Sequence, residues 1–298
     1  MATAARHAAG QALPRSLVWA TDIDVLPPGR IVQRRERYLV VRSPSNPLHY
    51  WGNFLIFDEP PRAGDASRWE ELFEREFADE PLVAHRVFAW DRADGELGAA
   101  QEEFVARSYE LERSVGLAAE LGALRPHPRA NREVHVRTLD PRARAEEELW
   151  EQVVEIWVAS HEDPAGEELH RDFSRRRLAE LREMFAAGAG AWYVAIEPAG
   201  GAVVASCGIV TTGPRGRFQA VDTHASFRRR GICSRLLIEA CRHSASEYGA
   251  RRFVIAADPG YHALGLYESL GFEAVEQVAG VCLKPASGSD AETPTGPD

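Results

Sequence analysis

Residues 133–284 carry two alternating patterns of hydrophobic and polar positions. Short segments that are apolar throughout, or apolar at every second position, predict β-strands, and longer segments with apolar residues three and four positions apart predict helices. The expected strands are 133–139, 191–197, 202–211, 216–223 and 252–258. The expected helices are 143–159, 167–187, 232–248 and 261–269, and a hairpin is expected at 272–284. This order predicts an α/β (α+β) fold, a mixed central sheet with helices on both faces.

The first part of the chain carries similar segments less regularly. The expected strands are 37–43, 51–58 and 85–91, the expected helices are 67–77 and 97–107, and a further extended segment begins at Tyr109. Between the two parts, residues 122–132 contain two prolines and no hydrophobic period, which is typical of a linker. We therefore expect one lobe at residues 21–121 and a second at 133–285. Residues 1–20 and the small, polar residues 286–298 are expected to be disordered.

A short stretch of the first half can be aligned with the second half, which predicts a degenerate internal repeat. Residues 104–117 can be laid on residues 267–280, so that Phe104 takes the position of Tyr267. The other matched pairs are Ser108 with Gly271, Tyr109 with Phe272 and Glu110 with Glu273. Because a phenylalanine has no hydroxyl proton to give, chemistry that depends on Tyr267 would be missing from the first half.

The composition is that of an ordinary globular protein: of 298 residues, 45% are hydrophobic and 27% are charged, and the net charge is −10. An acidic balance argues against a broad nucleic-acid or anionic-membrane surface and favours a cationic or amine substrate. The four cysteines show no C-x-x-C pair and no metal-ligand spacing, so we expect reduced thiols in a cytoplasmic protein and no bound metal. No apolar run approaches the roughly 20 residues of a membrane span, and residues 1–16 lack the apolar region of a secretory signal.

The most informative stretch, residues 227–237, reads F-R-R-R-G-I-C-S-R-L-L. It separates the expected strand at 216–223 from the expected helix that begins at Ile232. The free N–H groups and the positive dipole end of a first helical turn bind anions, and arginines add charge-assisted hydrogen bonds. The candidate phosphate-binding residues are Arg228, Arg229, Arg230, Gly231, Ile232, Cys233 and Ser234. The alternative interpretation is a basic loop in front of an ordinary helix.

The spacing Arg-x-x-Gly-x-small resembles motif A of the GNAT superfamily of N-acetyltransferases, which holds the pyrophosphate of acetyl-CoA. Residues 263–272, A-L-G-L-Y-E-S-L-G-F, resemble the family's motif B, and Tyr267 follows Gly231 by 36 residues. The resemblance covers residues 132–285 and, less closely, 36–120. It implies a GNAT fold with two tandem GNAT-like lobes, of which the first is degenerate. There the segment E-P-P-R-A-G-D-A-S places acids where the phosphate loop would lie.

The resemblance also implies roles for individual residues. The backbone of Val221 and Thr223, splayed by a bulge, would bind the pantetheine arm of acetyl-CoA and help to polarise the thioester carbonyl. Tyr267 would protonate the CoA thiolate as it leaves. Two positions depart from the family pattern, because Cys233 replaces a Gly or Ala and Gly260 replaces an Asn that contacts CoA. The residues that could supply that contact instead are Asp258, Tyr261 and His262.

A general base must take a proton from the substrate ammonium, and the sequence offers several candidates. Asp222 and His224 lie beside the arginine loop, and Asp258 and His262 follow the next expected strand. We single out His224 because its ordinary pKa suits proton transfer near neutral pH.

Two neighbouring features bear on this choice. Alternation along the strand at 216–223 would place Arg217 and Gln219 on the same face as Val221, which offers no base on that face. Cys233 presents an alternative, because a helix N-terminus beside arginines lowers the pKa of a thiol and could make it catalytic. Direct transfer of an acetyl group to an amine needs no such thiol.

These features together predict an acetyl-CoA-dependent N-acyltransferase that acts on a small-molecule or peptide amine, without nucleic-acid or membrane partners. One alternative is a CoA-binding sensor that has lost catalysis, and another is an interaction protein whose first lobe docks a partner. The segment 43–54 concentrates prolines with His49, Tyr50 and Trp51. It could form the wall of a substrate pocket, or simply a stiff hairpin with core aromatics.

Overall fold

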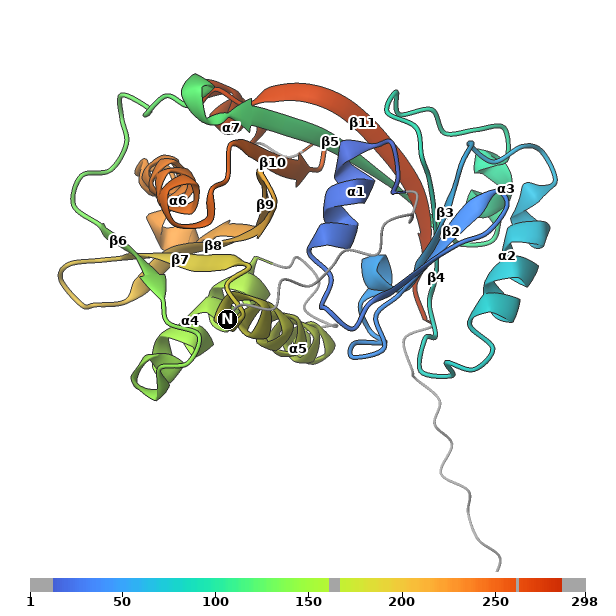
Figure 1. Ribbon diagram of the computed structural model, residues 1–298, viewed down its shortest axis with the longest axis horizontal. Coiled ribbons are helices and arrows are strands. Elements are labelled where there is room, and N and C mark those ends of the chain that lie inside the picture. The colour runs from blue at the N-terminus through green and yellow to red at the C-terminus, as the bar shows by residue number, and fades with distance from the viewer. Residues whose placement is uncertain (1–12, 161–166, 261–262, 286–298) are drawn as a thin grey trace, which may run out of the picture.

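The computed structural model describes residues 13–160, 167–260 and 263–285, and in this part of the chain eleven strands form one mixed sheet (Figure 1). The strands are β1 (Ile31–Arg34), β2 (Tyr38–Arg42), β3 (Phe54–Phe57), β4 (Arg86–Trp90), β5 (Glu110–Glu120), β6 (His135–Leu139), β7 (Gly190–Ile196), β8 (Val203–Thr212), β9 (Arg215–Thr223), β10 (Arg252–Ala257) and β11 (Glu273–Leu283). The helices are α1 (Leu17–Asp24), α2 (Asp65–Glu76), α3 (Gln101–Ala106), α4 (Glu147–Ala159), α5 (Glu167–Ala186), α6 (Ile232–Tyr248) and α7 (Leu264–Ser269). The predicted α/β class with helices on both faces of a mixed sheet is confirmed.

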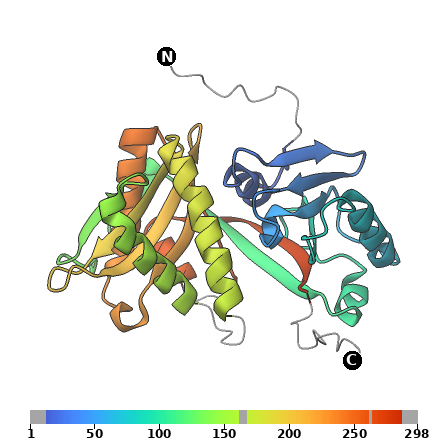
Figure 2. The same ribbon diagram turned by 90° about the horizontal axis from the view of Figure 1, so that it is seen from below.

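Helices cover both faces of the sheet in each half. In the second half, α6 and α7 pack on one face around Phe218, Leu236 and Phe253, whereas α4 and α5 pack on the other around Trp150 and Trp192. In the first half, α2 and α3 bury Trp69 and Phe104 against β2, β3 and β4. The short helix α1 covers the opposite face of these strands, with Val18, Trp19 and Ile23 buried. Figure 2 shows the two groups of elements side by side.

The two halves exchange their last strands. The sheet order is β1-β2-β3-β4-β11-β5-β10-β9-β8-β7-β6, so β11 lies between β4 and β5, and β5 lies between β10 and β11. Each half therefore ends with a strand that is separated from its own preceding strand by the last strand of the other half. The two exchanged strands pair with each other antiparallel, from Glu273 opposite Ala118 to Cys282 opposite Glu110. In Figure 2 they cross from one half to the other.

The predicted hairpin at 272–284 is wrong, because β11 is a single eleven-residue strand. No local sequence signal distinguishes the two cases, since the partners of β11 are β4 and β5 from the first half. Both partners are antiparallel to β11, as the arms of a hairpin would have been.

The turns that lead into the exchanged strands have the same geometry in both halves. Tyr109 donates its backbone N–H to the carbonyl of Phe104 at 3.0 Å, and Phe272 donates to the carbonyl of Tyr267 at 3.1 Å. Ser108 and Gly271 occupy equivalent places and both have positive φ, 66° and 100°. The aromatic pairs are edge-to-face in both turns. This geometry follows the alignment of residues 104–117 with 267–280 residue by residue.

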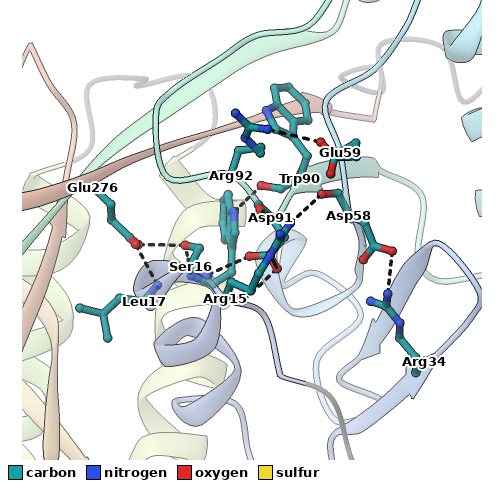
Figure 3. A network of polar contacts seen from close by, with 11 residues as sticks. Arg15, Ser16, Leu17, Arg34, Asp58, Glu59, Trp90, Asp91, Arg92 and Glu276 are labelled. Carbon is teal, nitrogen blue, oxygen red and sulfur yellow. Dashed lines mark hydrogen bonds and ion pairs between the residues drawn. The ribbon is translucent and has the colours of Figure 1, made fainter.

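The prediction of disorder over residues 1–20 is wrong where the structure describes the chain, because Leu17–Asp24 form α1. Figure 3 shows why the helix begins there. The Asp91 carboxylate accepts the backbone N–H groups of Arg15 and Ser16, both at 2.8 Å. The Glu276 carboxylate accepts the Leu17 N–H at 2.9 Å and the Val18 N–H at 2.5 Å, and so caps the helix from β11. The Ser16 hydroxyl, which accepts the Trp19 N–H at 3.3 Å, is the local N-cap, whereas the two distant carboxylates leave no trace in the local sequence. Residues 1–12 and 286–298 lie outside the described residues.

A bulge in β11 aims Glu276 at α1, since the register against β5 shifts between Ala274 and Glu276. Replacing Glu276 with Ala leaves first-turn N–H groups of α1 without their charged acceptor. We expect the free energy of unfolding to fall by about 2 kcal/mol, measured by urea denaturation. The control is Glu273→Ala, an exposed carboxylate on the same strand, which should change stability little. Equal midpoints for the two variants would contradict this role of Glu276.

Candidate functional site

The parallel strands β9 and β10 separate partway along their length. They are paired only where Arg215, Gly216 and Arg217 face residues 252–254. Beyond that point β9 continues to Thr223 and is paired with β8, while β10 continues to Ala257 and is paired with β5. The facing edges of residues 218–223 and 255–257 are therefore not bonded to each other. Unpaired backbone groups at such an opening can bind an extended ligand in the manner of an added strand.

A bulge lies at this opening and includes Val221, one of the two residues where a bulge was expected. Ser206 pairs with Asp222 and Gly208 with Gln219, so two residues of β9, Ala220 and Val221, oppose one residue of β8. Ala220 has a φ of 42°, which is rare for a residue with a side chain. The bulge is a strained and specific feature of this strand.

The bulge also changes which side chains share a face. Val221 packs with the α6 cluster, as Phe218 does, whereas Arg217 and Gln219 line a cavity on the other face of the sheet. The expectation that Arg217 and Gln219 point to the same side as Val221 is therefore wrong. The extra residue at the bulge shifts the alternation by one position, so Asp222 takes the face of Arg217 and Gln219.

The arginine loop follows β9 and leads into the N-terminus of α6. Arg228 donates its Nε–H to the carbonyl of Thr223 at 3.1 Å, and the Arg230 guanidinium lies 4.9 Å from the ring centre of Phe227. Gly231 is the N-cap and provides no side-chain cap to the first turn. Arg229 and Gly231 both have positive φ, 65° and 72°, a succession found in backbone nests that bind anions. Residues 228–234 thus form one continuous segment, in which the three arginines are exposed while Ile232 and Ser234 are buried.

The linker packs on this loop. Asn131 donates its N–H to the Gly231 carbonyl at 3.0 Å and its side-chain amide to the Arg230 carbonyl at 3.2 Å. A Cβ on Gly231 would lie 2.0 Å from the Arg129 carbonyl oxygen. The glycine is therefore required by close contact with the linker backbone, a reason that differs from the expected approach of an anion.

Cys233 lies half-buried in the first turn of α6. Burial, followed by the nearby Asp222 carboxylate, raises the pKa of this thiol to about 12, although a hydrogen bond with Thr223 acts in the opposite direction. The expectation that the helix terminus and the arginines lower this pKa is wrong. Because the thiolate is the nucleophilic form, the environment does not favour a catalytic cysteine.

Tyr267 lies on α7 and is buried, with 4% of its surface exposed. Its ring is 6.3 Å from that of Phe272. Tyr267, Ile232 and Leu236 belong to one buried cluster, so the fold brings the tyrosine and the start of α6 into the same part of the core. The two motifs that lie 36 residues apart in the sequence are thus joined by packing.

The candidate bases differ in their environments. Asp222 is half-buried, and burial raises its pKa to about 6 against the opposing effects of the Ser160 hydroxyl and Arg228. His224 is exposed, with its Nδ1 atom 2.8 Å from the Ser226 hydroxyl. Asp258 is also exposed and accepts the Gly260 N–H at 2.6 Å. His262 and Tyr261 lie outside the described residues.

A cavity of about 260 Å³ lies where the two halves meet. Residues of the first half line it together with residues of the second: Trp19, Asp22, Val25, His49, Trp51, Glu112 and Ser114 with Arg177, Arg217, Gln219, Ala256 and Val278. Of the three residues suggested by the sequence as a pocket wall, His49 and Trp51 line this cavity and Tyr50 does not. The missed signal lies in β5, where polar Glu112 and Ser114 alternate with buried Val115 and Leu117.

The sequence of residues 150–272 matches the acetyltransferase (GNAT) family. Residues 150–272 therefore form a domain of the GNAT superfamily, and the chain as a whole shares the GNAT fold. Acyl transfer is the general chemistry of this family, and acetyl-CoA is its typical donor. Among the residues that the structure describes, no helix has the length and apolar character needed to cross a membrane. The same residues contain no group of three or more metal-ligating side chains.

Several solved structures share the fold over nearly the whole chain. A functionally unknown conserved protein from Staphylococcus epidermidis has a TM-score of 0.72 at 15% identity, covering 88% of this chain and 96% of that one. A GCN5-related N-acetyltransferase from Kribbella flavida has a TM-score of 0.54 at 18% identity, covering 87% and 90%. A tandem GNAT protein from the clavulanic acid biosynthesis pathway has a TM-score of 0.52 at 15% identity, covering 90% and 89%. No curated protein sequence matches the chain.

The first GNAT-like lobe differs from the second at the corresponding opening. Its parallel strands β3 and β4 stay paired to their ends, where Phe57 faces Trp90 and the Asp91 N–H bonds to the Phe57 carbonyl at 2.8 Å. Gly64 begins α2 with a positive φ, as Gly231 begins α6, but the next residue is Asp65. The first lobe thus has a closed strand pair and an acid at the helix terminus, where the second lobe has an opening and an isoleucine.

Gly231 can be tested against a glycine with the same backbone conformation. Gly249, at the other end of α6, has a φ of 75° and open space for 4 Å around the place that a Cβ would take, whereas Gly231 has a φ of 72° and meets the linker. Gly249→Ala should cost about 1 kcal/mol of unfolding free energy through backbone strain alone. We expect Gly231→Ala to cost clearly more in thermal denaturation, because the linker must also move. Equal losses would show that the linker contact is unimportant.

Proposed function

We propose that this protein transfers an acyl group, typically acetyl, from CoA to a primary amine. The observation that carries the proposal is the opening between β9 and β10, which lies next to the uncapped N-terminus of α6 and its arginine loop. A pantetheine arm is an extended chain with amide groups, and it suits the unpaired backbone of residues 218–223. A pyrophosphate suits the first turn of a helix flanked by arginines.

In the proposed binding mode, Arg228, Arg229 and Arg230 supply positive charge, and the amides of Gly231, Ile232, Cys233 and Ser234 supply hydrogen bonds. Val221 and Thr223 offer their backbone at the bulge to the arm and to the thioester carbonyl. The side chain of Cys233 is partly buried and packs against the α6 cluster. A cysteine at this position is therefore compatible with a bound phosphate.

The proposed reaction is direct. The amine nitrogen attacks the acyl carbon, a C–N bond forms, and the C–S bond breaks with its electron pair on sulfur. Tyr267 gives its phenol proton to the departing thiolate, which leaves as the CoA thiol. The proton lost by the amine goes to a base on the other side of the sheet opening.

Asp222 suits the role of base better than His224. The register across the bulge puts Asp222 on the face of β9 that carries Arg217 and Gln219, whereas His224 is exposed beyond the end of the strand. A carboxylate whose pKa is raised to about 6 accepts a proton more readily than an ordinary one. Ser160, at the end of α4, contacts Asp222 and holds it at the opening.

Removal of the Tyr267 hydroxyl tests the acid role. We expect Tyr267→Phe to lower kcat for thiol release by about 10²–10⁴-fold, while the affinity for acetyl-CoA measured by calorimetry stays unchanged. Tyr248→Phe, which removes a hydroxyl at the far end of α6, serves as the control and should retain activity. If Tyr267→Phe retains full activity, the tyrosine only packs in the core.

The pH dependence tests the base. Asp222 must be ionised to accept a proton, so kcat/KM should fall as the pH drops through about 6, the raised pKa of this group. In Asp222→Asn this acid limb should disappear, with a rate about 10²-fold lower or more at neutral pH. His224→Gln should leave the limb in place. The reverse result would assign the base to His224.

The alternative function is a sensor that binds CoA without turnover. It predicts a different result in the same measurements. Such a protein would bind acetyl-CoA in calorimetry but would release no CoA thiol with any amine in a panel. The half-buried Asp222 favours the enzyme, because a carboxyl whose pKa is raised at the strand opening is typical of catalytic sites.

A further inference from the structure

We propose that the cavity between the two lobes is the acceptor site, and that it takes a compact primary amine whose ammonium group pairs with the Glu112 carboxylate. This inference rests on the proposed acyl-transfer function. It adds the substrate class, and it assigns the degenerate first lobe a direct part in substrate binding.

The cavity lies on the correct face of the sheet for an acceptor. Arg217 and Gln219 of β9 line it, and Asp222 follows on the same face of the strand. Ala256 of β10 lines it from the other side of the strand opening. An amine held in the cavity would thus approach the opening between β9 and β10 from the side of Asp222, opposite to the α6 and α7 cluster.

Most charges in the cavity wall already have partners. Arg217 donates to the Asp22 carboxylate at 2.7 Å, and Arg177 donates to Glu180 at 3.3 Å and to the Gln219 side chain at 3.1 Å. Burial, with Arg177 and His85 nearby, holds the pKa of His49 well below its ordinary value, so His49 is neutral. These groups together contribute no net charge.

Glu112 is the exception. It comes from the exchanged strand β5, and among the described residues no hydrogen bond or ion pair reaches its carboxylate. Burial raises its pKa, and the carboxylates of Glu110 and Asp258 add to this, while Lys284 acts in the opposite direction. Lys284 is bound at 2.6 Å to Glu110. An ammonium group would provide the missing partner for Glu112.

The remaining wall suits the body of an amine. The indoles of Trp19 and Trp51 are stacked with centroids 5.3 Å apart, and Val25, Ala256 and Val278 add apolar surface. Aromatic faces attract cations as well as apolar groups. Arg217 is 8% exposed and its Nε has no partner within the described part of the chain, so the wall also offers one hydrogen-bond donor to an oxygen of the ligand. The small volume favours a compact molecule.

Each lobe contributes about half of this wall, so the site is incomplete without the first lobe. Trp19 stands on α1, Trp51 follows β2, and Glu112 stands on β5, whereas Arg177, Arg217 and Ala256 belong to the second lobe. The first lobe lacks the features of a CoA site but retains the polar face of β5. Without a ligand, Glu112 on that face would be a carboxylate with no partner among the described residues, in a cavity where most other charges are paired.

The kinetic test uses the full chain with saturating acetyl-CoA and a panel of butylamine, ethanolamine, benzylamine and a lysine-containing decapeptide. We expect the small amines to be acetylated and the peptide to be a poor substrate. Glu112→Gln should raise KM for the best amine about tenfold or more, with kcat and the KM for acetyl-CoA within about twofold. Glu110→Gln, an acid on the same face that already pairs with Lys284, is the matched control and should behave as the parent protein.

A binding test separates this proposal from the acyl-transfer function. Calorimetry with benzylamine and its neutral analogue benzyl alcohol, in the presence of CoA, needs no turnover. We expect benzylamine to bind about tenfold tighter than benzyl alcohol, and Glu112→Gln to abolish that difference while the protein stays folded. A preference for benzylamine that persists in Glu112→Gln, the absence of any preference, or efficient acetylation of the peptide alone would overturn the assignment. If amines bind as expected but no thiol is released, the acceptor site stands and the enzymatic function fails.

Discussion

The antiparallel pairing of β5 with β11 is the contact on which both lobes depend. β11 lies beside β4 and completes the sheet of the first lobe, and β5 lies beside β10 and completes the sheet of the second. The same pair fixes the neighbourhood of the cavity, because β5 presents Glu112 and β11 presents Glu276, whose carboxylate caps α1. Helix α1 in turn is joined to β9 through the ion pairs of Asp22 with Arg217 and Asp24 with Arg215. The lobes therefore form one structure rather than two units connected by a linker.

The difference between the lobes can be stated as a difference in strand pairing. Parallel strands that remain bonded to their ends, as β3 and β4 do, satisfy each other's backbone and leave nothing for a ligand. Strands that part, as β9 and β10 do, leave backbone groups that a ligand or water must satisfy. The left-handed backbone of Ala220 maintains this opening at some cost in strain. A lobe that had lost its ligand would have no reason to keep such a feature.

Local patterns were sufficient for part of this picture. Helix α6 has the predicted bounds, and residues 228–234 lie together because they are contiguous in the sequence. The face of Arg217 could not be predicted, because one inserted residue at Ala220 reverses the alternation and no sequence signal marks it. The α1 helix was missed although Ser16 caps it locally, because the carboxylates that accept its other first N–H groups, Asp91 and Glu276, lie far along the chain. The cavity was missed because its walls come from residues between Trp19 and Val278, which only tertiary packing brings together.

The strand exchange has a consequence for how the chain is made. On the ribosome, residues 13–120 emerge first, yet β4 and β5 cannot close on each other, because β11 belongs between them. Until residues 252–257 and 273–283 are synthesised, one edge of β4 and both edges of β5 lack their partner strands, and such edges are prone to pair with other chains. Long-range pairing of this kind also slows folding, since a large loop must close before the contact is made. The first lobe can therefore complete its sheet only after the last strand of the second lobe has been made.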